Sequence, residues 1–379
     1  MLVPAIVTVF LGLYAGLIAS YFRAWKKLAP YTPSKLASVT VSVVIAARNE
    51  EHTLPLLLRD LQAQDYPAHL FEVIVVNDFS TDATAAAIQG APGNFRMIMP
   101  QCAPEESGKK KAIAGGVAVA KGDLILVTDA DCRVGQRWLS TMAAFCQDRG
   151  AAFVAAPVKY TYQPGVLPVL QVLDFITLQG ITAASVSSDF GTMCNGANLA
   201  YTKKAFEAVG GFAGIDKVPT GDDMLLMYKI WKQDKSKVFY LKSSDATVST
   251  GAVATWKEFL MQRRRWASKT LVYDDIRLIV VLGFVLLFNL VPVALLILGF
   301  WQPFSLLYLL FFLAIKTAIE WPFVLAVAKF FNQESLMRYF FFLQPLHVFY
   351  TVFVGIWSQL GGYEWKGRAA PGPSKGGGI

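Results

Sequence analysis

The chain has 379 residues, of which 54% are hydrophobic and only 16% carry a charge. Because soluble domains carry about 25% charged residues, this composition argues against a wholly soluble protein and predicts membrane segments. The net charge of +8 is not gathered into an aromatic-interleaved basic patch or a nucleic-acid-binding motif, so we do not expect a nucleic-acid partner.

The first predicted element is a transmembrane anchor at the N-terminus, residues 1–25. Residues 2–22 are apolar and uncharged, and Arg23, Lys26 and Lys27 follow them. A secretory signal peptide would carry its positive charges before the apolar run, so a retained anchor is favoured. The positive-inside rule then places the following domain in the cytosol, and we expect the plasma (inner) membrane as the location. The four cysteines show no CxxC spacing, which argues against a zinc site and suits a reducing compartment.

A cytosolic α/β domain is predicted over residues 36–275. Runs of β-branched and apolar residues predict buried strands, at 39–46, 73–76, 96–99 and 124–127. Helical stretches lie between them, at 50–63, 80–89 and 109–120. This alternation predicts an open, mostly parallel sheet flanked by helices, which binds ligands at the carboxyl ends of its strands. The glycine motifs of dinucleotide-binding and P-loop folds are missing from the sequence.

Polar side chains follow these strands. Asp129 and Asp131 come directly after the strand at 124–127, where both carboxylates can turn toward one ion. Their hard oxygens suit Mg²⁺ or Mn²⁺, although a lone Asp-x-Asp triplet also occurs in ordinary surface turns. The lysine run at 109–111 opens a helix and either lies in solvent or contacts a diphosphate. Asp78 either accepts a hydrogen bond from a base or ribose, or caps a turn.

Two further segments of the domain leave alternatives open. Asp222 and Asp223 precede an apolar helical run and either cap that helix or supply a general base. The stretch at 256–266 predicts an interfacial helix with aromatic and arginine side chains at the headgroup level. A functional interpretation adds an arginine for a leaving diphosphate and a tryptophan platform for a sugar ring. The stretch at 171–185 is either an interfacial helix near an acceptor or a buried helix of the domain.

Three transmembrane helices are predicted over residues 278–361. Their apolar stretches lie at 278–300, 304–327 and 338–361, each close to the roughly 20 residues that span a bilayer. Lys316 and Glu320 are four residues apart and either pair on one helix face or line a polar path. The Pro-, Gly- and Lys-rich segment at 362–379 is expected to be a disordered tail. Counting the predicted crossings places this basic tail outside, which conflicts with the positive-inside rule, and a re-entrant span would remove the conflict.

Taken in this order, the segments closely resemble the membrane-embedded family 2 glycosyltransferases, which have a GT-A fold. The resemblance runs from about Val41 to Trp266. It is carried by the segments VSVVIAARNE, VNDFSTD, GKKKAIAGGVAVAKGD, DAD, CNGANLAYTKKAFEAVGGF, TGDDMLL and QRRRW. The last is similar to the Q/R-x-x-R-W signature of ceramide glucosyltransferases and processive polysaccharide synthases.

The resemblance implies a set of donor-binding residues. Glu50 and Asp78 would contact the nucleotide base and ribose, and Lys109 would lie near the donor. Asp129 and Asp131 would bind the donor diphosphate, Asp131 through a Mg²⁺ or Mn²⁺ ion. The sequence departs from the family pattern where Asn77 replaces the usual Asp and where Ala114 replaces a common Asn, which puts the sugar preference in doubt.

The resemblance also implies the catalytic and acceptor residues. Asp223 would be the catalytic base, and Asp222 would take a place usually held by Glu beside the acceptor. Gln262, Arg265 and Trp266 would border the diphosphate and the acceptor. The implied reaction is an inverting transfer in which Asp223 deprotonates the acceptor hydroxyl as this hydroxyl attacks the anomeric carbon of a nucleotide-sugar, expected to be UDP-linked.

Three functional alternatives remain open from the sequence. The short membrane domain favours transfer of a single sugar to a lipid, at the cytosolic face of the membrane. A processive polysaccharide synthase, working as a homo-oligomer or with a partner, is the second interpretation, and its acceptor would be a saccharide. A catalytically inactive nucleotide-sugar-binding scaffold or transporter is the third, although such a protein would be free to lose the carboxylates that this chain retains.

Overall fold

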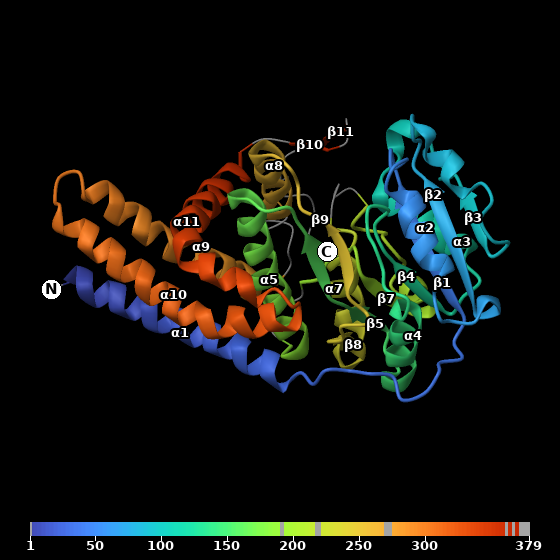
Figure 1. Ribbon diagram of the computed structural model, residues 1–379, viewed down its shortest axis with the longest axis horizontal. Helices are drawn as coiled ribbons and strands as arrows, with labels where there is room; N and C mark the ends of the chain where they lie inside the picture. Colours follow the sequence, from blue (N-terminus) through green and yellow to red (C-terminus); the bar gives the residue numbers. More distant parts are fainter. Residues whose placement is uncertain are drawn as a thin grey trace. The chain divides into compact units, whose positions relative to one another are not determined.

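The structure is a computed structural model that describes residues 2–189, 193–216, 221–268, 275–360, 363–365 and 368–370 (Figure 1). The chain divides into two compact units. Unit 1 comprises Met1–Leu28, Tyr162–Gly191 and Ala252–Ile379, and unit 2 comprises Ala29–Thr161 and Thr192–Gly251. Each unit is therefore assembled from segments that are distant in the sequence.

Unit 2 is built on a seven-stranded sheet with the order β3-β2-β1-β4-β7-β5-β8. The strands are β1 (Val41–Ala47), β2 (Phe71–Asn77), β3 (Phe95–Ile98), β4 (Leu124–Val127), β5 (Phe153–Ala155), β7 (Leu199–Thr202) and β8 (Val238–Tyr240). Only β7 runs antiparallel to its neighbours, β4 and β5. A second, parallel pair joins β6 (Val158–Thr161) to β9 (Val248–Gly251). The predicted open, mostly parallel α/β sheet is thus confirmed.

Helices flank this sheet, namely α2 (Leu54–Gln62), α3 (Lys109–Val119), α4 (Trp138–Arg149), α6 (Lys203–Ala208) and α7 (Met224–Gln233). Short 3₁₀ turns lie at Ala68–Leu70, Ala83–Ile88, Pro104–Glu106 and Lys235–Lys237, so the helix expected at 80–89 is a 3₁₀ segment. Helix α3 packs against β1 and β2. A Cβ atom at Gly116 would lie 2.4 Å from Val44 Cγ1, so glycine permits this close approach. The approach fixes the helix whose first residue is Lys109.

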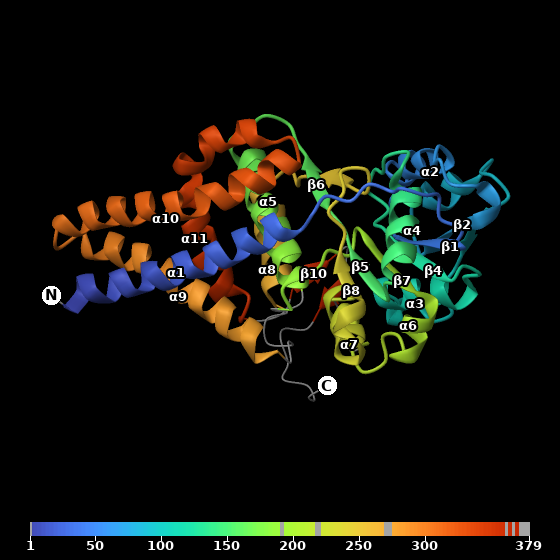
Figure 2. The same cartoon turned by 90° about the horizontal axis from the view of Figure 1, so that it is seen from below.

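Unit 1 is helical (Figures 1 and 2). Its helices are α1 (Leu2–Lys27), α5 (Val166–Ser187), α8 (Trp256–Ala267), α9 (Ile276–Leu298), α10 (Phe304–Phe330) and α11 (Phe340–Trp357), with a 3₁₀ turn at Glu334–Tyr339 before α11. Among the described residues, five segments are long and apolar enough to cross a membrane: Val7–Lys27, Val166–Ser187, Ile276–Leu298, Phe304–Phe330 and Glu334–Trp357. We expected four, and α5 is the addition.

Helix α5 differs from the other long helices of unit 1. It packs against α1 and α10, and both views show it crossing them steeply (Figures 1 and 2). Most of its side chains are buried, including the polar ones of Gln171, Asp174 and Gln179. At Gly180 a Cβ would lie 2.6 Å from Val327 Cγ2 of α10, so the two helices are in close contact. Of the two alternatives for residues 171–185, a largely buried helix matches, although the helix packs within unit 1.

The compact units therefore cut across the predicted boundaries. We expected residues 36–275 to form one domain, whereas residues 162–191 and 252–275 belong to unit 1. The physical reason is that α5 and α8 bury their apolar side chains against α11 in a shared core that contains Leu167, Leu170 and Phe259. In the expected disordered tail, Tyr363–Trp365 and Arg368–Ala370 form a short antiparallel pair, and residues 371–379 lie outside the described residues.

The charged residues of α10, Lys316 and Glu320, pair on one helix face, which is the simpler of the two predicted arrangements. Lys316 Nζ lies 2.6 Å from Glu320 Oε1 and donates to Gln344 Oε1 at 2.9 Å. Glu320 also accepts hydrogen bonds from Tyr14 and Gln344. Because every charge in this buried group has a partner, the pair is suited to holding α1, α10 and α11 together.

Candidate functional site

The register of the sheet brings three strand ends of unit 2 together. In β1, Ala47 pairs with Asn77 of β2, and Val44 pairs with Val127 of β4. The residues that follow these parallel strands therefore emerge side by side at one edge, where open α/β sheets bind ligands. Arg48 Nη1 donates to the backbone oxygen of Asp78 at 2.9 Å and ties two of these loops together.

Lys109 joins two carboxylates that are distant in the sequence. Its Nζ lies 2.6 Å from Asp129 Oδ1 and 3.3 Å from Asp222 Oδ2. Burial by itself would lower the pKa of this ammonium, but Asp129, then Asp222, more than compensate and raise it above its ordinary value. Lys109 therefore stays charged. It links the start of α3, the loop after β4 and the segment before α7.

Asp223 is the N-cap residue of α7, and backbone donors fix its carboxylate. Oδ1 accepts from Met224 N at 2.8 Å, and Oδ2 accepts from Gly196 N at 3.0 Å. The negative charge of Asp223 also stabilises the charged form of Lys109. Asp129, Asp222 and Asp223 thus converge electrostatically on one lysine, and we call these four residues the acidic site.

Gly196 keeps space open beside this acidic site. A Cβ atom on Gly196 would lie 3.0 Å from Lys109 Nζ, 3.3 Å from Asp222 Oδ2 and 3.5 Å from Asp223 Cβ. A side chain here would press against Lys109 and Asp222 and would lie in ordinary van der Waals contact with Asp223. Sequence analysis did not single out Gly196, although it lies within the CNGAN segment that contributes to the family resemblance.

Asn198 anchors the loop that carries Gly196. Its buried Nδ2 donates to Pro157 O at 2.8 Å and to Ala246 O at 2.7 Å. Its Oδ1 accepts from the indole Nε1 of Trp138 at 3.0 Å. A buried amide with these three bonds holds the loop rigidly, because releasing any partner would leave a buried polar group unsatisfied.

Asp131 is exposed beyond the end of β4. Its Oδ2 accepts from Thr250 Oγ1 of β9 at 3.4 Å. The neighbouring Cys132 is buried, and burial, followed by the charges of Asp129 and Asp131, raises the pKa of its thiol. This thiol therefore stays protonated at neutral pH and is a poor metal ligand.

The Asp-Ala-Asp triplet supplies two carboxylates of the type that binds magnesium or manganese. In this structure Asp129 contacts Lys109 and Asp131 contacts Thr250. Within the described ranges, no group of three or more His, Cys, Asp or Glu side chains forms a complete cation cage. Mg²⁺ is commonly held by one or two carboxylates together with substrate phosphates, so a pair of hard oxygens is an adequate protein contribution. The donor set here is of that kind.

Glu50 and Asp78 follow the neighbouring strands β1 and β2. Asp78 is buried, and its Oδ1 accepts a hydrogen bond from Ser107, two residues before Lys109. Glu50 accepts from Thr53 Oγ1 at 2.5 Å, and its backbone N donates to Thr84 Oγ1 at 2.7 Å. These bonds orient both loops at the same sheet edge that carries Asp129.

The other three predicted site residues belong to unit 1. Gln262, Arg265 and Trp266 lie on α8, which begins with a capping box between Thr255 and Glu258. All three side chains are partly exposed. The structure therefore groups the predicted acidic residues in unit 2 and the QRRRW residues on one helix of unit 1. Thr220, in the TGDD segment, lies outside the described residues.

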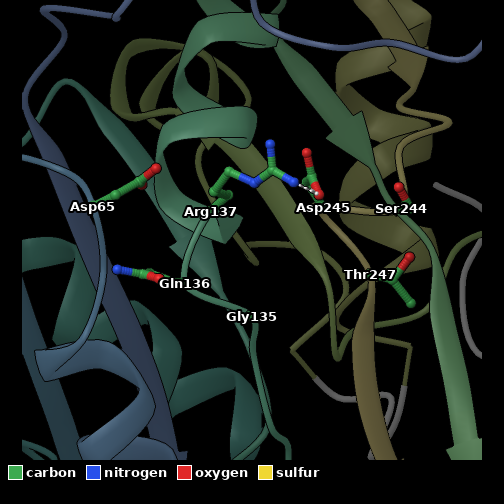
Figure 3. Close-up of a pocket in the computed structure, with 7 residues that line it drawn as sticks. All are labelled: Asp65, Gly135, Gln136, Arg137, Ser244, Asp245 and Thr247. Atoms are coloured by element: carbon green, nitrogen blue, oxygen red, sulfur yellow. Dashed lines mark ion pairs between the residues drawn. The ribbon is translucent and has the colours of Figure 1, made fainter.

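A pocket of about 360 Å³ opens elsewhere in unit 2 (Figure 3). It is lined by Asp65, Gly135, Gln136, Arg137, Ser244, Asp245 and Thr247. Arg137 Nη2 and Asp245 Oδ1 form an ion pair of 2.9 Å across it (Figure 3). None of the predicted site residues lines this pocket, so it is not the candidate donor site.

Comparison with known proteins identifies the family. Residues 38–269 match the family described as glycosyltransferase like family 2. Glycosyltransferase AglE of Haloferax volcanii is 29% identical over 128 residues, which cover 33% of this chain and 41% of that protein. Beta-monoglucosyldiacylglycerol synthase of Nostoc sp. is 26% identical over 237 residues, which cover 60% of this chain and 48% of that protein. The chain thus spans less than half the length of these relatives.

A solved structure supports the fold. Mannosyltransferase PcManGT of Pyrobaculum calidifontis, in complex with GDP-Man and Mn²⁺, superposes with a TM-score of 0.56 and 18% sequence identity. The match covers 93% of this chain and 99% of the other. At this identity the likeness concerns the fold, and it agrees with the GT-A type expected from the sequence.

Proposed function

Because the chain belongs to glycosyltransferase family 2, we propose that it transfers a sugar, with inversion, from a nucleotide-diphosphate sugar to a lipid at the cytosolic membrane face. One observation carries the proposal. Lys109 draws Asp129 and Asp222 together, beside Asp223, at the carboxyl edge of the sheet. A diphosphate needs cationic groups and a divalent ion, and an acceptor hydroxyl needs a base, so this grouping supplies the required residue types.

The donor would lie along the strand ends. Glu50 and Asp78 would contact the base and ribose, because they follow the adjacent strands β1 and β2. Lys109 would contact the diphosphate, exchanging a carboxylate partner for a phosphate oxygen. Asp129 and Asp131 would hold a Mg²⁺ or Mn²⁺ ion, which would neutralise the charge that grows on the departing diphosphate. UDP is the nucleotide that we expect.

Asp223 would act as the base in the transfer. Its carboxylate is held by the backbone N–H groups of Met224 and Gly196, so it is oriented before the acceptor arrives. It would take the proton of the acceptor hydroxyl while that oxygen attacks the anomeric carbon from the face opposite the nucleotide. Asp222 would border the acceptor. Gln262, Arg265 and Trp266 keep the roles that the resemblance implies, and Arg265 would stabilise the leaving diphosphate.

Membrane attachment would place the acceptor at the bilayer surface. Helix α5 connects β6 to β7, and both of these strands pair with other strands of unit 2. If α5 crossed the bilayer once, it would divide these sheets between two compartments, so α5 would lie at the membrane without crossing it. The crossings would then be α1, α9, α10 and α11, and unit 2 would stay in the cytosol at the plasma (inner) membrane.

A lipid acceptor is favoured over a growing polysaccharide. Four transmembrane helices are few for enclosing a polymer channel within one chain. A processive synthase would therefore need a homo-oligomer or a partner. The name of the Nostoc relative, a monoglucosyldiacylglycerol synthase, concerns a glycolipid and points in the same direction. An inactive scaffold or transporter is disfavoured because Asp129, Asp131, Asp222 and Asp223 are all present.

A donor and acceptor screen tests the proposal. Membranes that contain the protein are incubated with labelled UDP-, GDP- and other nucleotide-sugars, and the products are analysed by mass in lipid and polymer fractions. One added sugar on a lipid supports the proposal, and a ladder of products supports the processive synthase. If membranes that contain the folded protein give no labelled product with any nucleotide-sugar, the inactive scaffold is supported.

A further inference from the structure

A buried carboxylate joins three helices of unit 1. Asp174 of α5 has a side chain that is only 7% exposed, and both of its oxygens are engaged. Oδ2 accepts a hydrogen bond from Arg263 Nε of α8 at 2.9 Å, and Arg263 Nη2 lies 2.6 Å from the same oxygen as an ion-pair contact. Oδ1 accepts from the Tyr350 hydroxyl of α11, and His347 Nε2 lies 3.6 Å away. We call these four residues the Asp174 cluster.

Arg263, which Asp174 holds in place, contacts two other residues of the QRRRW segment. Its Nη1 donates to Gln262 Oε1 at 2.7 Å. Its guanidinium carbon lies 4.3 Å from the centre of the Trp266 ring and 4.7 Å from that of Phe259. Trp266 also packs against Phe175, the residue that follows Asp174. Two residues with proposed substrate roles therefore depend on how Arg263 is held.

The three consecutive arginines of α8 divide their contacts. Arg263 is 4% exposed and faces Asp174, whereas Arg264 is 9% exposed, donates to Leu360 O and lies 4.3 Å over Trp357. Arg265 is the more exposed of the three. Because successive residues of an α-helix point about 100° apart, the helix directs the first two arginines inward and the third elsewhere.

We propose that Asp174 and Arg263 are positioning residues of the enzyme. Asp174 holds the guanidinium of Arg263, and the guanidinium fixes the side chains of Gln262 and Trp266. Arg263 is therefore a buried residue that positions its neighbours, and it does not bind the diphosphate. The inference rests on the proposed function, since it concerns side chains with proposed roles toward donor and acceptor.

Arginine and aspartate are the side chains that this task requires. A guanidinium has five donors in a fixed plane, so one edge can bind a carboxylate while a remaining N–H reaches Gln262 and the flat face covers Trp266. Lysine, with a single ammonium, cannot hold these three groups in one geometry. Removing one partner of a buried pair leaves the other charge uncompensated, so a change at either Asp174 or Arg263 should disturb the cluster.

The Lys316–Glu320 pair provides a matched control. It lies in the same unit, Lys316 and Glu320 are 0% and 8% exposed, and the pair has a similar contact distance of 2.6 Å. Among the described residues, its hydrogen-bonding partners are Tyr14 and Gln344, which lie outside α8, and its link to the Asp174 cluster is the electrostatic interaction of Glu320 with His347. Asp174→Asn and Glu320→Gln are both isosteric and both remove one buried negative charge.

The test compares these two variants in the full-length, detergent-purified protein. The readouts are kcat and KM for transfer, the Kd of UDP, and the ¹⁹F spectrum after 5-fluorotryptophan labelling, in which Trp266→Phe identifies the Trp266 resonance. We expect Asp174→Asn and Arg263→Lys to lower kcat/KM by about 10- to 100-fold, as a small misplacement does, while the Kd of UDP changes less than about two-fold. Both variants shift the Trp266 resonance, and Glu320→Gln leaves kcat/KM and this resonance unchanged.

Two results would overturn the proposal: an unshifted Trp266 resonance in Asp174→Asn, or an equal loss of kcat/KM in Glu320→Gln. If Asp174→Asn does not fold, Tyr350→Phe decides, because it removes one hydrogen bond to Asp174 without changing a charge. We expect a smaller shift of the same resonance, and no shift would contradict us. The ¹⁹F readout needs no turnover, so it separates failure of this proposal from failure of the proposed activity.

Discussion

The acidic site of unit 2 and the Asp174 cluster of unit 1 are both built from carboxylates and a cationic side chain, but their environments differ. In the acidic site, Asp129 is 37% exposed and shares one flexible lysine with Asp222. In the Asp174 cluster, the carboxylate is 7% exposed, with Arg263 at Oδ2 and with Tyr350 and His347 at Oδ1. A lysine contact can be exchanged for a phosphate or a metal ion, whereas a saturated, buried carboxylate has no capacity for a ligand. The acidic site is therefore suited to binding ligands and to catalysis, and the Asp174 cluster is suited to fixing the positions of helices.

Removal of divalent ions should cause the largest loss of transfer activity, and it should affect the acidic site and not the Asp174 cluster. With a chelator we expect transfer to stop, because Asp129 and Asp131 would lose the ion that neutralises the diphosphate, a contribution of several kcal/mol. Added Mg²⁺ or Mn²⁺ should restore it. The measurement is the initial rate of transfer, alongside the thermal unfolding midpoint, which should not move. Full turnover in chelator would remove the metal role from Asp129 and Asp131.

Asp223→Asn should come next. The amide cannot take a proton, so kcat should fall by about 10²- to 10⁴-fold. Its single oxygen keeps one of the two backbone N–H contacts of residue 223, and UDP should still bind because the proposed donor-binding residues are unchanged. Asp234→Asn is the matched control, since Asp234 caps the other end of α7 and accepts from Ser236. Full turnover by Asp223→Asn would show that another group is the base.

Gly196→Ala tests how much free space the acidic site needs. The added Cβ would press on Lys109 and Asp222, and we expect kcat/KM to fall by about 10- to 100-fold through misplacement of these groups. Gly115→Ala is the control, because a Cβ at that position of α3 meets nothing within 4 Å. An unchanged kcat/KM in Gly196→Ala would show that Lys109 and Asp222 can shift without loss of activity. The buried Asp174 cluster, by contrast, is not expected to tolerate such a shift.

Lys109→Met should have the smallest of these effects. Because Lys109 is 22% exposed, loss of its charge-assisted contact should cost about 1.5 kcal/mol, the lower end of the usual range, and raise the KM for the donor by about 10-fold. Lys111→Met, two residues along the same helix, removes only a surface pair with Glu106 at 3.3 Å and should leave the KM unchanged. Equal KM values for wild type and Lys109→Met would show that Lys109 balances the carboxylates without contacting the donor.

The strands and the acidic positions could be predicted from local sequence. The β-branched runs near Val41 and Val73 produce strands buried on both faces, and strand order along the chain places Asp129 at a carboxyl edge. The long apolar runs likewise predicted α1, α9, α10 and α11. These features depend on residues that are close together in the chain, where propensity and periodicity operate.

Partners that are distant in the chain could not be predicted in this way. Asp174 and Arg263 are 89 positions apart, and Lys110 and its acceptor Ile215 O are 105 positions apart. No periodic pattern marks such a pair, since the contact exists only after helices or loops from separate segments pack. Gly196 is a similar case, because its importance comes from the atoms that surround it and not from its own conformation.

The sequence by itself determined the α/β class of unit 2, the apolar helices of unit 1 and the identity of the acidic residues, because each follows from composition or short-range pattern. Only the tertiary structure decided that β7 runs antiparallel, that α5 packs with α1 and α10, and that Lys109 joins Asp129 to Asp222. It also decided that the first two arginines of QRRRW are buried and the third is partly exposed. The physical reason is that burial and ion pairing depend on which surfaces meet in space, and local propensity does not encode that.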